Sequence, residues 1–110
     1  MTEDKLQQNC FIWFNNQYCL NYHNPKCVIF SVPNGGSRNL LEAKRLKATG
    51  LKAGVSDLIV LMPERCIFIE MKTEKGYQSD KQKEFEQSVK DLGFEYHLIR
   101  SFEQFQNLFL

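Results

Sequence analysis

Two acidic residues and one lysine stand at a spacing that would bring their charges together at one end of a β-hairpin. Asp57 precedes an apolar run at residues 58–62, and Glu70 closes a second run at residues 66–69, with Lys72 two positions later. Carboxylates are ligands for hard divalent cations, and a neighbouring ammonium can orient a water molecule or neutralise developing negative charge. The pattern therefore points to a site for a hard divalent cation.

A β-hairpin is the element that must position these three side chains. Both apolar runs are rich in β-forming residues, and Pro63-Glu64-Arg65 separates them as a turn. A turn centred between Pro63 and Glu64 places three pairs of residues opposite one another: Leu61 with Cys66, Ile59 with Phe68, and Asp57 with Glu70. Side-chain alternation puts Lys72 on the face of Glu70. Opposed carboxylates destabilise a sheet unless a cation compensates them.

The spacing of Asp57 and Glu70-x-Lys72 resembles the PD-(D/E)xK nuclease superfamily. The surrounding motifs resemble, more narrowly, the virus-type replication-repair nuclease (VRR-NUC) domain, and they occur in the order Asn34-Gly35-Gly36-x-Arg38, Lys47-x-x-Gly50, Gly54-Val55-Ser56-Asp57, Glu70-Met71-Lys72, Gly76 and Ser79-x-x-Gln82. The resemblance covers nearly the whole chain. One residue departs from it, because Ser56 stands where the family usually has Pro.

The resemblance implies an active site that holds Mg²⁺ or Mn²⁺. Asp57, Glu70 and the backbone carbonyl of Met71 would be the metal ligands. Lys72 would act as a base toward water or as an electrostatic stabiliser, and the sequence leaves these two roles open. A salt bridge between Lys72 and the acids at a strand end is the structural alternative.

Three polar residues outside the hairpin match family positions near the metal site. Glu3 and Gln7 lie one helical turn apart, and Glu3 also fits as an acid that favours a helix N-terminus. Gln82 would lie beside the metal. Its place in Ser79-x-x-Gln82 equally fits a capping box, in which the Gln82 side chain folds back to the Ser79 backbone.

Basic residues concentrate in one segment, although the 110-residue chain has a net charge of only +1. Positions 38–52 hold one acidic residue, Glu42, and five basic residues: Arg38, Lys44, Arg45, Lys47 and Lys52. A basic segment in a near-neutral protein is a reasonable phosphate-facing surface. We interpret four of these residues as DNA contacts, namely Arg38, Lys44, Lys47 and Lys52. A solvated helix face would explain the same lysines.

The remaining patterns predict a single α/β domain over residues 1–110 with the element order α-β-α-β-β-α-β-α. Thr2 caps the first helix, a second helix starts at Ser37 or Asn39 and ends at Gly50, and a third follows Ser79. That third helix is expected to bury Leu92. It connects the second hairpin strand to a strand at residues 94–99, which makes those two strands parallel. The result is a mixed four-stranded sheet flanked by helices, which agrees with the restriction-endonuclease-like core that the resemblance implies.

Composition points to a soluble cytoplasmic protein. No apolar run approaches the roughly 20 residues of a membrane-spanning helix, and no signal-peptide pattern opens the chain. The four cysteines form no CxxC pair, and Cys19-x₃-His23-x₃-Cys27 lacks a fourth nearby zinc ligand. The family resemblance further implies a viral or prophage protein that acts in the host cell.

These observations predict a Mg²⁺- or Mn²⁺-dependent DNA endonuclease. Family members of this stand-alone size resemble Holliday-junction resolvases, so branched DNA is the expected substrate. A flap or restriction-like nuclease and a non-catalytic DNA-binding module are the alternatives.

A homodimer is expected, because each chain offers one site and resolving a junction needs two cuts. Phe11 through Phe14 would supply exposed apolar surface for the interface, unless the last helix covers them within one chain. That helix carries Phe102, Phe105 and Phe109.

Overall fold

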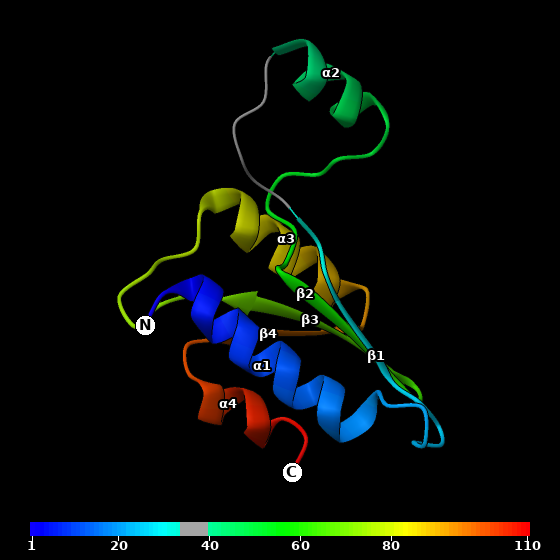
Figure 1. The fold of residues 1–110 in the computed structure, drawn as a ribbon. Helices are drawn as coiled ribbons and strands as arrows, with labels where there is room; N and C mark the ends of the chain where they lie inside the picture. Colours follow the sequence, from blue (N-terminus) through cyan, green and yellow to red (C-terminus); the bar gives the residue numbers. More distant parts are fainter. Residues whose placement is uncertain (34–39) are drawn as a thin grey trace.

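The computed structural model describes residues 1–33 and 40–110, which form a four-stranded sheet with helices on both faces (Figure 1). The elements follow in the predicted order: α1 (Glu3–Tyr18), β1 (Val28–Ser31), α2 (Leu40–Ala48), β2 (Leu58–Met62), β3 (Arg65–Met71), α3 (Asp80–Asp91), β4 (Glu95–Ile99) and α4 (Phe102–Asn107). Asn34, Gly35, Gly36 and Arg38, and the helix starts predicted at Ser37 or Asn39, lie outside the described residues.

The sheet has the order β1-β2-β3-β4. The pairs β1–β2 and β2–β3 are antiparallel, and β4 runs parallel to β3 because α3 connects them. The hairpin register is the predicted one, since Leu61 pairs with Cys66 and Ile59 with Phe68. The α/β architecture is therefore confirmed.

The hairpin ladder ends one residue earlier than predicted. Its last pair is Leu58 with Ile69, and Asp57 is not a ladder partner of Glu70. The backbone N–H of Asp57 instead donates to the Ile69 carbonyl at 3.0 Å. The Asp57 carboxylate accepts a hydrogen bond from the Met71 N–H at 2.7 Å. The Asp57 side chain thus takes the place of the backbone carbonyl that would continue the ladder.

One face of the sheet forms the hydrophobic core with α1 and α4 (Figure 1). The completely buried strand residues on this face are Leu58, Val60, Ile67, Ile69 and Met71. Phe14 on α1 and Phe105 on α4 are also fully buried, and the ring of Trp13 packs edge-on against Phe105. Helix α4 thus covers Trp13 and Phe14 within one chain, as the alternative interpretation of this aromatic run expected.

Helix α3 covers the opposite face of the sheet, where the ring of Phe85 contacts Phe68 at a centroid distance of 5.7 Å. Its first turn is held by the predicted capping box, in which Ser79 Oγ accepts from Gln82 N at 3.2 Å. The prediction that Leu92 is buried is wrong. Leu92 follows the last helical turn as the C-cap, and its side chain is 75% exposed.

Helix α2 projects beyond the end of α3, away from the sheet (Figure 1). Gly50 follows it with a φ of +112°, in the left-handed region that glycine adopts easily, which confirms the predicted helix end. Within residues 1–33 and 40–110, no helix is both long and apolar enough to cross a membrane.

Candidate active site

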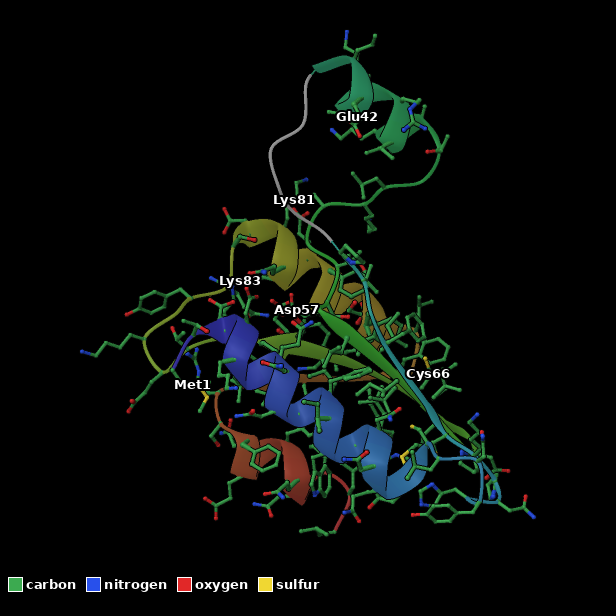
Figure 2. The ribbon with its side chains drawn as sticks, in the orientation of Figure 1. Met1, Glu42, Asp57, Cys66, Lys81 and Lys83 are labelled. Carbon is green, nitrogen blue, oxygen red and sulfur yellow. The ribbon has the colours of Figure 1, made fainter. Side chains whose placement is uncertain are left out.

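Asp57, labelled in Figure 2, lies at the open end of the hairpin. The charge of Asp57 acts on the Glu70 carboxylate, which contacts Gln82 in the first turn of α3. The Met71 N–H fixes one oxygen of the Asp57 carboxylate. Glu70 lies next to Met71 on β3 but points to the other face of the sheet, toward α3. Two residues that are distant in sequence thus place their carboxylates side by side.

Glu70 is buried without a full set of hydrogen-bond partners. Its side chain is only 1% exposed, and Oε1 is the single buried side-chain polar atom in the described part of the chain that has no partner. Burial raises the pKa of Glu70 to about 8, and the charge of Asp57 raises it in the same direction, whereas Lys72 lowers it. A carboxylate in this position is unfavourable unless another positive group approaches it.

Gln82 links the carboxylate to α3. Its Oε1 accepts from the Ser79 N–H at 2.8 Å, and its Nε2 donates to Glu70 Oε2 at 3.0 Å. The two roles considered for Gln82 are therefore combined, because the two ends of one primary amide serve different partners. The bond to Nε2 fixes the Glu70 carboxylate and leaves Oε1 free.

Lys72 follows on the same face as Glu70, and its charge acts on that carboxylate. Its side chain is half-buried, and no hydrogen bond or ion pair engages its ammonium among the residues that the structure describes. The predicted alternative, a simple salt bridge with the acids, is not formed. The ammonium is therefore available to a ligand.

The loop that follows Lys72 is held by Arg100, which sequence reasoning missed. Nη1 of Arg100 lies within hydrogen-bond distance of three carbonyl oxygens, those of Thr73, Glu74 and Gly76, at 2.7, 3.3 and 2.8 Å. A single guanidinium thus fixes the backbone directly after the Lys72 strand. Contacts with main-chain carbonyls leave no residue-type pattern that could have indicated this role.

Gly54 sets the distance between the Asp57 segment and α3. It has a φ of +84°, and a Cβ built on it would lie 2.4 Å from the Lys81 carbonyl oxygen and 2.9 Å from the Gln82 nitrogen. Only glycine permits this close approach of two backbones. Ser56, which stands in place of the family's Pro, is 1% exposed, and its hydroxyl donates to the Leu58 carbonyl at 3.4 Å.

Glu3 lies farther out than the other predicted site residues. Its side chain is exposed in the first turn of α1, and its charge makes the smallest of the contributions that raise the pKa of Glu70. The structure therefore brings Asp57, Glu70, Lys72 and Gln82 together and leaves Glu3 at the edge of the group. Favourable interaction with the helix N-terminus accounts for Glu3 equally well.

The predicted DNA-contacting lysines are exposed on and after α2. Lys47 and Lys52 line a cleft of about 510 Å³ that Lys81 and Glu84 of α3 close from the other side. Lys81 is labelled at the first turn of α3 in Figure 2, and its ion pair with Glu84 is an exposed one, at 3.4 Å. Lys44 lies on α2 outside this cleft, beside Arg45. Lys81 was missed because it is indistinguishable in sequence from a solvated lysine.

The donor atoms at the site fit a hard divalent cation. Nowhere in residues 1–33 and 40–110 do three His, Cys, Asp or Glu side chains form a group that could hold a metal. Asp57 and Glu70 are therefore two ligands that main-chain, water or phosphate oxygens would have to complete. Mg²⁺ is commonly bound in this way, through one or two carboxylates with several waters retained. The unpartnered Glu70 Oε1 is the atom such an ion would satisfy.

Comparisons with known proteins identify the family and the fold. The family model of the VRR-NUC domain matches residues 1–103. A solved structure of a "VRR_NUC domain protein" superposes with a TM-score of 0.77 at 23% identity, covering 98% of this chain and 84% of that one. A second, titled "VRR_NUC domain", gives 0.63 at 18% identity, covering 96% and 91%. These identities show the fold alone. A comparison with curated proteins found no match.

Proposed function

The chain belongs to the VRR-NUC family, and from this premise we propose that it is a Mg²⁺- or Mn²⁺-dependent endonuclease that hydrolyses phosphodiester bonds in branched DNA. Membership in the family implies a nuclease-type function. The observation that carries the proposal is the buried Glu70 carboxylate, with one oxygen held by Gln82 and the other without a partner beside Asp57.

The residues of the site divide the work of hydrolysis. Asp57, Glu70 and the Met71 carbonyl would hold the cation, which supplies Lewis acidity toward the phosphate and lowers the pKa of water. Gln82 keeps the Glu70 carboxylate in one orientation. Lys72 directs its free ammonium toward the phosphate, where it orients the attacking water or neutralises charge as the bond breaks.

The DNA backbone would approach along the lysines beside α3. Lys47, Lys52 and Lys81 face one cleft, and Lys44 extends the basic surface along α2. Contacts of this kind position a phosphate backbone without selecting a base sequence. We therefore expect recognition of DNA shape and strong salt dependence of binding.

The proposal is tested by cleavage of labelled DNA of defined structure. With Mg²⁺ or Mn²⁺, we expect incisions in a four-way junction at a rate well above that on linear duplex or single strands. Replacing the cation with EDTA should stop cleavage entirely, because two neighbouring carboxylates cannot perform the reaction alone. Preferred cutting of a 5′ or 3′ flap would identify a flap nuclease. Binding of DNA without cleavage in either Mg²⁺ or Mn²⁺ would identify a non-catalytic DNA-binding module.

We further propose that the protein acts as a homodimer, since paired cuts in a junction require two sites. Helix α4 covers Trp13 and Phe14, whereas Phe11 and Ile12 remain 37 and 47% exposed. A second exposed apolar surface lies on the sheet. On the face of the sheet that α3 occupies, β1 and β2 expose three apolar residues. Val28, Phe30 and Leu61 are 45, 41 and 40% exposed. Val28 and Leu61 are cross-strand neighbours, so these residues form one continuous patch. A patch of this kind is typical of a protein interface.

Light scattering at micromolar concentration should give about twice the 12.9 kDa mass of one chain. Leu61→Glu should yield monomers that nick junctions without resolving them, because a charge in the centre of the patch would be desolvated. Leu110→Glu adds the same charge to a residue that is 88% exposed at the C-terminus, and it should remain dimeric. A wild-type mass near that of one chain would remove the paired-cut mechanism.

A further inference from the structure

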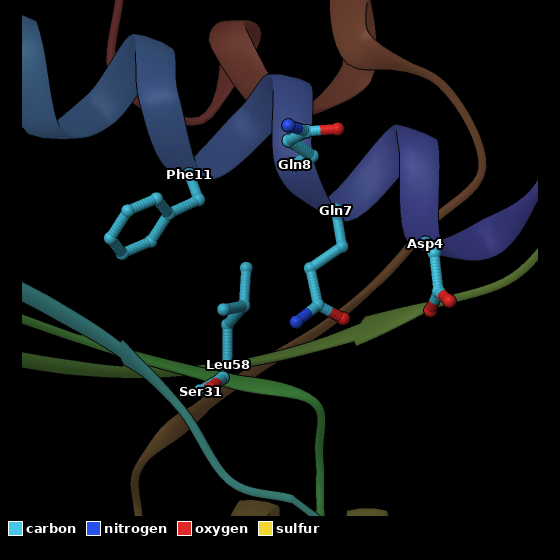
Figure 3. A pocket seen from close by; sticks show the side chains of 6 residues that line it. All are labelled: Asp4, Gln7, Gln8, Phe11, Ser31 and Leu58. Atoms are coloured by element: carbon cyan, nitrogen blue, oxygen red, sulfur yellow. The ribbon is translucent and has the colours of Figure 1, made fainter.

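A pocket of about 330 Å³ lies between α1 and the sheet (Figure 3). Its lining comes from one face of α1 and from the two strands below it: Asp4, Gln7, Gln8, Phe11, Ser31 and Leu58. Leu58 forms part of the floor and follows Asp57 directly in the chain. A ligand in this pocket would therefore contact the residue that follows a proposed metal ligand in the chain.

The polar side chains of the pocket are free to bind a ligand. Within the described residues, those of Asp4, Gln7, Gln8 and Ser31 make no hydrogen bond or ion pair. Gln7 is half-buried, and its amide points from α1 toward the sheet (Figure 3). A primary amide offers one acceptor and two donors, which is the combination that pairs with the edge of a nucleobase.

Phe11 differs from the other aromatic residues of α1. Trp13, Phe14 and Tyr18 all contact other rings. No ring contact involves Phe11 in the part of the chain that the structure describes, and its side chain is 37% exposed over the pocket (Figure 3). An aromatic ring with an open face is a stacking platform for a base.

The charge of the pocket favours a nucleobase over a phosphate as its ligand. Among the residues that the structure describes, its lining includes the carboxylate of Asp4 and no lysine, arginine or histidine. A phosphate would be repelled here, whereas an exocyclic amino group can donate to the carboxylate and to the Gln7 amide oxygen. Phosphates are served instead by the lysine cleft beside α3.

We propose that this pocket binds an unpaired, amino-bearing nucleobase of the DNA strand, stacked on Phe11 and hydrogen-bonded by Gln7 and Asp4. The inference rests on the proposed function in taking DNA as the ligand, and it adds the substrate class: DNA with an unpaired nucleotide next to the cut. A base inside a duplex cannot enter such a pocket without leaving its stack. Junction and flap branch points supply nucleotides for which that step costs least.

Binding is measured in EDTA, so that it is independent of cleavage. The probe is a single-stranded pentanucleotide with 2-aminopurine at its centre, and we expect a saturable change in its fluorescence. Phe11→Leu should weaken binding about 5- to 150-fold, since stacking contributes on the order of 1–3 kcal/mol per base. Phe94→Leu makes the same substitution at a 49% exposed phenylalanine on the other face of the sheet, and its affinity should stay unchanged.

A second variant tests the hydrogen bonds. In competition with the 2-aminopurine probe, the wild type should prefer a central adenine over unsubstituted purine, which lacks the amino group. Gln7→Met should reduce this preference while keeping the fluorescence change of the probe. An unchanged affinity in Phe11→Leu, or no signal with the wild type, overturns the proposal. Cleavage without base binding would reject the pocket alone, and base binding without cleavage in any metal would reject the nuclease assignment alone.

Discussion

Glu70→Gln and Asp57→Asn should each abolish DNA cleavage, with a loss on the order of 10³-fold or more, while the protein stays folded. Both changes keep the shape of the side chain and remove a carboxylate that would bind the cation. Cleavage is measured on the preferred DNA substrate at saturating Mg²⁺. Retention of activity in either variant would refute the assignment of that residue as a metal ligand.

The same substitution at Glu70 should not destabilise the metal-free protein. The folded-state pKa of about 8 lies above the ordinary value of 4.5, so the folded chain retains a proton that the unfolded chain releases. The free energy of unfolding of the wild type must then fall as the pH rises from 4.5 to 8. Glu70→Gln has no such proton to lose, and its amide can donate to Asp57.

Thermal unfolding in EDTA is the measurement for this effect. The Tm of Glu70→Gln should exceed that of the wild type by an amount that grows between pH 4.5 and 8 and stays constant above pH 8. Each kcal/mol of difference in unfolding free energy should raise the Tm by several degrees. Lys83→Gln provides a control at an exposed residue of α3 and should follow the wild-type curve. A variant that melts below wild type at pH 8 would mean that Glu70 is a structural residue stabilised as the anion.

Lys72→Met should separate binding from catalysis. Methionine keeps most of the volume of the half-buried stem and removes the ammonium, which has no partner among the described side chains. We expect junction binding in Ca²⁺ within a few-fold of wild type and a turnover in Mg²⁺ lower by about 10²- to 10⁴-fold, the range of general acid–base catalysis.

The control for Lys72→Met is Lys52→Met, which removes an ammonium from the proposed phosphate cleft. That variant should weaken binding and reduce its salt dependence, with little change in turnover at saturating DNA. Should binding and turnover fall together in Lys72→Met, Lys72 is a phosphate anchor and the catalytic role is wrong.

The hairpin and its carboxylates could be predicted because their signals are local. Pro63 and Glu64 fix the turn, and Glu64 adopts a φ of +60° there, so the register of the two strands follows by counting. The early end of the ladder at Asp57 could not be predicted in this way. It depends on whether a side chain or a backbone group reaches the Met71 N–H, and both satisfy the same donor.

Contacts between distant segments account for what the sequence did not reveal. Helix α4 covers Trp13 and Phe14 only because the two ends of the chain pack together, which no local pattern indicates. Arg100 reaches backbone carbonyls of the loop after Lys72, and Gly54 meets the first turn of α3. For Gln82 the sequence supported two roles as alternatives, and the geometry of one amide accommodates both.

The position of these groups along the chain bears on how the catalytic centre forms during folding. Gly54, Asp57, Glu70 and Gln82 belong to one continuous stretch, whose ends meet where Gly54 touches α3. The loop entropy lost in closing this stretch is smaller than that lost in docking α1 or α4, which join opposite ends of the polypeptide. Low contact order favours early formation of such contacts. The carboxylate pair can thus assemble before α1 and α4 dock on the other face of the sheet.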